Sequence, residues 1–212
     1  MRKTLIIAAA VVAAVLLAIT ITVLAVRPAA VPSASPSPSS SAETGDHVLE
    51  EGGEVVLVEF LDPECPACAA FHPVVQELRA EFGDRMTYAV RFFPLQQHPN
   101  AVTASVAAEA AGQQDAFEPM LDLLFERQAD WAGSQESQLP LFREYAAELG
   151  LDLAVWDAAV ADEATLQAVA DDAAAGAALG VRSTPTFLLD GRMLELTSYD
   201  DLRDTVAEAL GE

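Results

Sequence analysis

The spacing of apolar and polar positions divides the chain into an apolar N-terminal run and a longer patterned region. Residues 4–26 are uncharged and mostly apolar. As a helix they would extend ~34 Å at 1.5 Å per residue, which is enough to cross a bilayer. Arg2 and Lys3 precede the run, and the positive-inside rule places them in the cytoplasm. We therefore predict a transmembrane anchor over residues 1–27, because a cleaved signal peptide, the alternative, usually has a shorter apolar stretch.

A linker rich in proline, serine and alanine follows the apolar run. Between residues 28 and 41, Val31 is the one residue of another type. Such a composition cannot bury a core and predicts an extended tether. We assign the linker to residues 28–46 and one folded domain to residues 47–212, a length that suffices for a single good core. Since the anchor is expected to cross the membrane, we expect this domain outside the cytoplasm.

The next pattern is typical of a strand, a helix and a second strand. Residues 54–61 are rich in valine and suit a buried strand, and residues 66–82 carry apolar residues at helical spacing. Pro73 lies inside that helix, where the missing hydrogen bond should produce a kink. A second strand is expected over residues 86–93, ending at Pro94. If the two strands are parallel, the unit is a right-handed βαβ crossover.

An alanine-rich helical block separates this unit from the C-terminal elements, and we place it at about residues 98–180. Its expected helices cover residues 100–112, 116–128, 140–149, 153–161 and 163–179. After it, two short apolar runs flank Asp190 and Gly191, a strong hairpin signal. Ser198 then suits the N-cap of a helix over residues 199–210. Six aromatic residues are assigned to the core rather than to a client groove: Phe92, Phe93, Trp131, Phe142, Tyr145 and Trp156.

The charge of the predicted domain excludes one class of partner. Eight arginines and all 33 acidic residues lie after residue 42, which gives that part a net charge of −25. Such a surface repels nucleic acid and anionic lipid headgroups, so we expect no nucleic-acid binding. A preference for basic clients is the functional interpretation of this charge. A solvated surface without a specific partner is the one we favour.

The chain contains two cysteines, Cys65 and Cys68, where the first predicted strand gives way to a helix. Unpaired backbone amides and the helix dipole favour a thiolate at a helix N-terminus, so the pair suggests redox chemistry. Half of a zinc site is a weaker alternative, because the three histidines are not paired at ligand spacing. An inert structural disulfide is also weaker, since closing so short a loop stabilises little.

Three sets of residues together resemble the disulfide oxidase (DsbA) branch of the thioredoxin fold. The first is the redox motif from Cys65 to Cys68, with Pro66 and Ala67 between the thiols. The second is the segment of residues 180–187, which is similar to the one that carries a cis-proline in that family. The third is an acid six residues before the first cysteine. The resemblance covers nearly all of residues 50–210 and implies an α/β thioredoxin-like fold with a helical insertion, here preceded by one transmembrane helix.

The resemblance implies a role for each of these residues. Cys65 would be the exposed nucleophile, and Cys68 would resolve the mixed disulfide. Glu59, buried beneath Cys68, would have a raised pKa and accept the proton of the resolving thiol. Pro185 would be cis and would set the backbone of Thr184 beside the nucleophile, where a client segment can pair. No metal or organic cofactor is implied beyond the redox-active disulfide itself.

Residues around the motif are expected to tune its redox poise. Ala67 stands where the strongest oxidases of the family have histidine, and it offers no charge or side-chain hydrogen bond. Asp62 and Glu64 are close in sequence, and their charges would raise the pKa of Cys65. His72 lies on the same helix face as the thiols, where a protonated imidazole would favour the thiolate. A milder oxidant, or a reductant, is therefore an alternative to a strong oxidase.

These observations lead to one preferred function and two alternatives. We expect an extracytoplasmic thiol-disulfide oxidoreductase, tethered through residues 4–26, that forms disulfides in exported client proteins and is reoxidised by a membrane redox partner. One alternative is a thiol reductase or isomerase, for example in cytochrome maturation. The other is a non-catalytic metal-binding module on the same fold, although copper carriers of that kind commonly place three residues between their cysteines.

Overall fold

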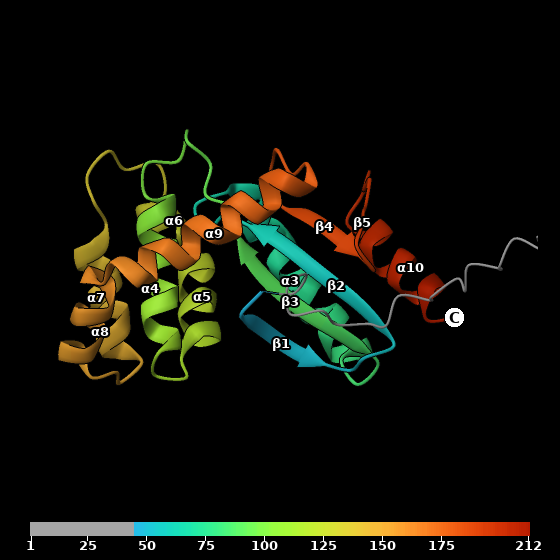
Figure 1. The fold of residues 1–212 in the computed structure, drawn as a ribbon, viewed down its shortest axis with the longest axis horizontal. Coiled ribbons are helices and arrows are strands. Elements are labelled where there is room, and N and C mark those ends of the chain that lie inside the picture. Colours follow the sequence, from blue (N-terminus) through green and yellow to red (C-terminus); the bar gives the residue numbers. More distant parts are fainter. Residues whose placement is uncertain (1–44) are drawn as a thin grey trace, which may run out of the picture. The chain divides into compact units, whose positions relative to one another are not determined.

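The computed structural model describes residues 45–212 (Figure 1). The predicted anchor over residues 4–26 and most of the predicted linker lie outside this range. Within residues 45–212, no helix has both the length and the apolar character that a membrane crossing needs.

A five-stranded sheet forms the centre of the described domain, with strand order β1-β3-β2-β4-β5. β2 pairs in parallel with β3, as the βαβ prediction requires, and every other pairing is antiparallel. β1, which no sequence pattern predicted, pairs with the outer side of β3. The strand bounds are β1 His47–Glu51, β2 Val55–Leu61, β3 Met86–Phe92, β4 Thr186–Leu189 and β5 Arg192–Met193.

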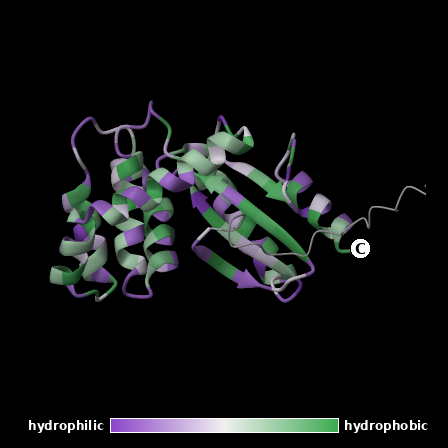
Figure 2. Cartoon of the chain, in the orientation of Figure 1, coloured by the Kyte–Doolittle hydropathy of each residue, from purple (hydrophilic) through white to green (hydrophobic). Residues whose placement is uncertain are grey.

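The central strand β2 is buried on both faces, which explains its nearly continuous apolar sequence. Figure 2 shows these apolar residues along the strand. Leu57 and Leu61 point to the face covered by α3 (Pro66–Phe82) and α10 (Asp200–Ala209). Val58 and Phe60 alternate to the opposite face. α3 starts and ends as predicted and is a continuous helix through Pro73.

The helical insertion is built from six helices, one more than predicted. The expected helix over residues 116–128 is divided at Arg127 into α5 and α6. Five of the six aromatic residues assigned to the core are indeed buried, whereas Phe93 is partly exposed. The helix bounds are α4 Ala101–Gly112, α5 Phe117–Glu126, α6 Gln128–Trp131, α7 Leu139–Glu148, α8 Leu153–Ala161 and α9 Glu163–Leu179.

The long helix α9 connects the insertion to the sheet (Figure 1). It packs against α4 at one end and against β3 at the other. Gly176 permits the close approach, because a Cβ atom there would lie 2.8 Å from the ring of Phe93 and 2.9 Å from that of Phe60. α9 ends at Gly180, whose φ of 93° is in the left-handed region. The chain then enters the segment that carries Pro185.

The C-terminal hairpin and helix follow the predicted order. Asp190 and Gly191 both have positive φ angles, as a tight hairpin turn requires. β5 is shorter than expected because the chain soon turns towards the cap of α10. There the Ser198 hydroxyl accepts a hydrogen bond from the Asp201 amide at 3.3 Å, and the Asp201 carboxylate accepts one from the Ser198 amide at 2.9 Å. The prediction of Ser198 as N-cap is therefore off by one residue, because the helix begins at Asp200 with Tyr199 as its N-cap, although the Ser198 side chain still accepts an amide of the first turn.

Candidate active site

The two thiols lie at the start of α3, where the chain leaves the carboxyl end of β2. Cys65 is the N-cap residue, and Pro66 occupies the first turn, where a missing amide hydrogen costs nothing. Both cysteines are free thiols. Cys65 is 6% exposed and Cys68 is 0% exposed. Cys65, which the resemblance implied to be exposed, is therefore also buried, and it is only slightly more accessible than Cys68.

The two thiols have opposite electrostatic environments. The pKa of Cys65 is lowered from 9.0 to about 5, above all by a hydrogen bond from the Cys68 thiol. Further hydrogen bonds from Thr184 and from the backbone amides of Cys68 and Ala67 act in the same direction, against the effect of burial. The pKa of Cys68 is raised well above 9.0, because burial disfavours its thiolate. At neutral pH the pair thus holds one thiolate and one thiol.

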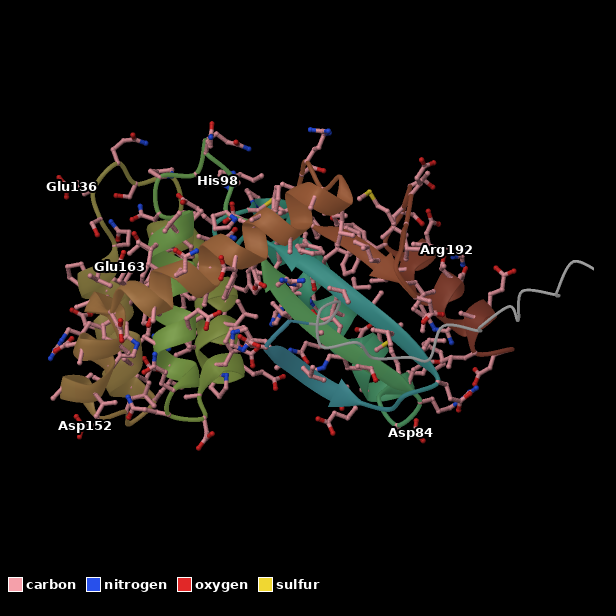
Figure 3. All side chains as sticks on the ribbon, viewed as in Figure 1. Asp84, His98, Glu136, Asp152, Glu163 and Arg192 are labelled. Atoms are coloured by element: carbon pink, nitrogen blue, oxygen red, sulfur yellow. The ribbon has the colours of Figure 1, made fainter. Side chains whose placement is uncertain are left out.

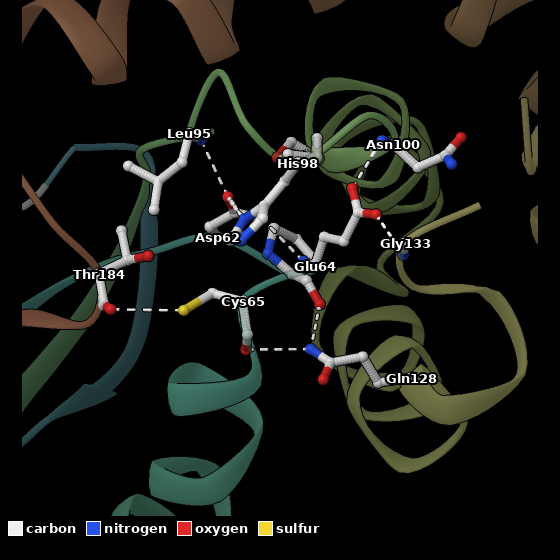
Figure 4. Close-up of polar contacts among 12 residues, drawn as sticks. Asp62, Glu64, Cys65, Leu95, His98, Asn100, Gln128, Gly133 and Thr184 are labelled. Atoms are coloured by element: carbon white, nitrogen blue, oxygen red, sulfur yellow. Dashed lines mark hydrogen bonds and ion pairs between the residues drawn. The ribbon is translucent and has the colours of Figure 1, made fainter. Parts of the chain in front are cut away.

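Thr184 and Pro185 face this pair from the loop between α9 and β4. The peptide bond between them is cis, as the resemblance implied. The carbonyl oxygen of Thr184 lies 3.4 Å from the sulfur of Cys65 and accepts its thiol hydrogen bond (Figure 4). The Thr184 hydroxyl is buried and has no other partner in the described part of the chain. When Cys65 loses its proton, this hydroxyl is available to donate to the sulfur.

Glu59 is buried in the middle of β2, with 3% of its surface exposed. The Tyr88 hydroxyl donates a hydrogen bond to its carboxylate at 2.5 Å. Burial raises the pKa of Glu59 from 4.5 to about 7, while the Tyr88 hydrogen bond and the charge of His72 act to lower it. The Glu59 charge in turn helps to raise the pKa of Cys68. The predicted burial and raised pKa of this acid are therefore confirmed.

His72 lies on the predicted helix face but has a different partner from the expected one. Its Nε2 atom is 3.0 Å from the carboxylate of Asp122, and its ring lies beside that of Phe125, with the centroids 4.9 Å apart. It is not among the groups that set the pKa of Cys65. The reason is that α5 packs against α3 and presents Asp122 to the imidazole. The charge of His72 lowers the pKa of Glu59 instead.

The pKa of Cys65 is lowered, although Asp62 and Glu64 were expected to raise it. Both acids are buried, and neither is among the largest causes of the Cys65 shift. One Asp62 oxygen accepts the backbone amide of Glu64 at 2.8 Å, and the other accepts that of Leu95 at 2.9 Å and lies 2.7 Å from Nδ1 of His98. The Asp62 carboxylate is thus hydrogen-bonded to donors other than the thiol of Cys65 (Figure 4).

Glu64 fastens the same loop to the helical insertion. Its two carboxylate oxygens accept the backbone amides of Asn100, at 2.6 Å, and Gly133, at 2.7 Å. Gln128 adds two hydrogen bonds from its side-chain amide to the carbonyl oxygens of the residues that flank Glu64, at 2.8 and 3.0 Å. These contacts fix the position of the thiol-bearing loop relative to the insertion. Gln128 and Asn100 were not predicted from the sequence, because no local pattern links residues so far apart.

Acidic residues occur on more than one side of the described domain. Figure 3 shows Asp84, Asp152, Glu136 and Glu163 on different sides of the described domain. Within residues 45–212, no cluster of three or more histidine, cysteine or acidic side chains is arranged to hold a metal ion.

Comparisons with known proteins give three kinds of similarity. The model of the family described as "Thioredoxin" matches residues 42–208. The Na(+)/H(+) antiporter NhaA of Herminiimonas arsenicoxydans is 40% identical over 156 residues, covering 73% of this chain and 24% of the relative. The Na(+)/H(+) antiporter NhaA 1 of Mycobacterium sp. (strain KMS) is 36% identical over 151 residues, covering 69% and 24%. The chain thus spans about a quarter of the length of the curated relatives it matches.

Solved structures share the fold at low sequence identity. A thioredoxin-like oxidoreductase from Silicibacter pomeroyi DSS-3 has a TM-score of 0.68 at 24% identity, covering 82% of this chain and 99% of that one. Oxidised BdbD from Bacillus subtilis has a TM-score of 0.69 at 19% identity, covering 83% and 97%. A variant of alpha-DsbA1 from Wolbachia pipientis has a TM-score of 0.67 at 21% identity, covering 81% and 98%. The insertion is therefore part of a known variant of the fold.

Proposed function

The chain belongs to the thioredoxin family, and from that membership we propose that it is a thiol-disulfide oxidoreductase whose reactive pair is Cys65 and Cys68. The observation that carries the proposal is the asymmetry of the two thiols. Cys65 is held as a thiolate beside Thr184, while Cys68 is fully buried and protonated. A nucleophile and a resolving thiol need these two different states.

As an oxidase, the protein starts from the Cys65–Cys68 disulfide. A client thiolate attacks the sulfur of Cys65, a client–Cys65 bond forms, and Cys68 leaves with the electron pair and takes a proton from Glu59. A second client thiolate then attacks the client sulfur of the mixed disulfide, and Cys65 leaves as a thiolate. The client has lost two electrons and gained a disulfide, and the protein has become a dithiol.

The lowered pKa of Cys65 favours this direction over reduction. A thiolate that is stable at neutral pH stabilises the dithiol form of the protein, so the disulfide form becomes the stronger oxidant. The leaving group of the last step is also this stable thiolate. We therefore propose disulfide formation in exported clients, followed by reoxidation by a membrane redox partner, with reduction or isomerisation as the alternative.

We further propose that the domain works outside the cytoplasm, tethered by residues 4–26. The apolar run and the linker composition support this placement. The relatives at 36–40% identity are named as Na(+)/H(+) antiporters, so domains similar to this one occur in the chains of ion transporters. A fusion of alkaline phosphatase after residue 212 tests the placement, because that enzyme becomes active only after export to an oxidising compartment. An inactive fusion would contradict it.

The catalytic proposal is tested with reduced, unfolded ribonuclease as the client. The oxidised protein should restore ribonuclease activity, and Cys65→Ser should abolish this. Cys68→Ser should also abolish it. When Cys65 of this variant is first joined to 5,5′-dithiobis(2-nitrobenzoate) as a mixed disulfide, a client thiolate should attack the Cys65 sulfur, displace the coloured thiolate and leave a client–Cys65 mixed disulfide. A reduction potential much more oxidising than that of thioredoxin supports the oxidase, and one near it supports a reductase. Stoichiometric zinc or copper held by the two thiols, without turnover, would instead support the metal-binding alternative.

A further inference from the structure

We propose that Tyr88 is a positioning residue that holds Glu59 in place to exchange a proton with Cys68: Glu59 gives the proton when Cys68 leaves the disulfide and takes it back when Cys68 re-forms the disulfide. The inference rests on the proposed function, because it concerns the proton transfer within that reaction. It assigns a role to a buried tyrosine that no sequence pattern singled out.

The sheet brings the two side chains together. β2 and β3 run in parallel with Leu57 opposite Tyr88, and Glu59 is two residues further along β2, on the same face. Tyr88 is 3% exposed, and its hydroxyl lies 2.5 Å from a Glu59 oxygen. Burial and the Glu59 charge raise the pKa of Tyr88 well above its ordinary value, so the phenol keeps its proton and donates. The carboxylate is held on this face of the sheet, where the resolving thiol also lies.

The other ionisable groups around Glu59 come from α3 and do not replace this hydrogen bond. Cys68 is the thiol that exchanges a proton with Glu59, and His72 acts on Glu59 through its charge alone. The guanidinium of Arg79 lies 5.5 Å from the centre of the Tyr88 ring, but its nitrogens pair with Glu50 of β1 and Glu118 of α5. In the described residues, no ion pair joins Glu59 to a cation.

The hydrogen bond from the neutral Tyr88 phenol brings the pKa of Glu59 to an intermediate value. Burial alone disfavours its charged form, and the Tyr88 hydrogen bond offsets part of that effect, so the pKa is about 7. A proton acceptor works best when its pKa is close to the operating pH. In the reverse of the oxidase's first step, the Cys68 thiol gives its proton to Glu59, its sulfur bonds to Cys65, and the group held on Cys65 leaves as a thiolate. Without the phenol, more of Glu59 would already be protonated at pH 7.

The test uses Tyr88→Phe and the reagent 5,5′-dithiobis(2-nitrobenzoate), mixed in excess with the reduced protein. Attack by Cys65 releases one coloured thiolate, and resolution by Cys68 releases a second, so stopped-flow absorbance resolves the two steps. In Tyr88→Phe, the pH midpoint of the second step should rise by about one unit, because one hydrogen bond to a charged group is about that strong. Release at pH 7 should then be about fivefold slower, since the ionised fraction of Glu59 falls from about one half to about one tenth. The first step should keep its midpoint near pH 5.

Tyr145→Phe is the matched control, since the hydroxyl of this buried tyrosine has no partner in the described residues. It should leave both steps unchanged. Glu59→Asp, which draws the carboxylate back from the phenol, should shift the second step as Tyr88→Phe does. An unchanged second midpoint in Tyr88→Phe, or an equal shift of both steps, would overturn the inference. If the unaltered protein releases no second thiolate at any pH, the proposed function fails, and this inference fails with it.

Discussion

Acidification should remove most of the extra stability that the reduced protein draws from the Cys65 thiolate. Its pKa of about 5 in the folded state is below the ordinary 9.0. A group with a lowered folded pKa stabilises the protein above its unfolded pKa, and this contribution is lost as the pH falls through the folded value. At pH 7, which is two units above the folded pKa, the thiolate contributes about 2.7 kcal/mol to the free energy of unfolding. By pH 4 almost nothing of this should remain.

The oxidised protein is the internal reference, because its sulfurs cannot titrate. Other groups, including Glu59, titrate in both forms and largely cancel in the difference. Urea denaturation of the reduced and the oxidised protein at pH 7 and pH 4 therefore isolates the contribution of Cys65. The same energy corresponds to ~60 mV in a two-electron potential, in the direction that makes the disulfide more oxidising.

Alkylation gives an independent measurement of the same thiolate. The rate of iodoacetamide labelling should rise through a midpoint near pH 5, with the label on Cys65 and almost none on Cys68. The Cys68→Ala variant, which removes the main hydrogen-bond donor, should move this midpoint upwards, whereas Cys68→Ser keeps a donor and should move it less. A difference between reduced and oxidised stability that stays constant from pH 4 to pH 7 would refute the reasoning.

Two further predictions concern the framework of the site, and chemical denaturation checks both. Glu64→Gln should destabilise the protein by about 1–3 kcal/mol, because one buried backbone amide loses its acceptor. The same change at the exposed Glu144 is the control and should have almost no effect. Equal effects of the two changes would contradict the role of Glu64. Gly176→Ala should destabilise by about 1–3 kcal/mol, since its methyl group overlaps two phenylalanine rings. Gly112→Ala is the control: its added methyl group would make only ordinary van der Waals contacts, so this change should be neutral or slightly stabilising. A stabilising Gly176→Ala would contradict the prediction and show that α9 can move away from the sheet.

The sequence by itself determined the order of elements and the identity of the redox motif. Both depend on residues that are close along the chain. Apolar spacing predicted α3 and α9 to the residue, and the position of Cys65 between a strand and a helix predicted its thiolate. β1 was missed because its five residues alternate polar and apolar character weakly at the sheet edge, where they are only partly buried.

Only the tertiary structure decided how charge is distributed around the thiols. Asp62 and Glu64 are neighbours of Cys65 in sequence, and proximity alone predicted that they would oppose its thiolate. Their carboxylates instead accept hydrogen bonds from Leu95, Asn100 and Gly133, which are between 33 and 69 residues away. Periodicity records which face of an element is buried, but it does not record which distant donor meets a buried acid. That pairing arises when the insertion packs onto the loop, and it leaves the backbone amides and Cys68 to set the acidity of the nucleophile.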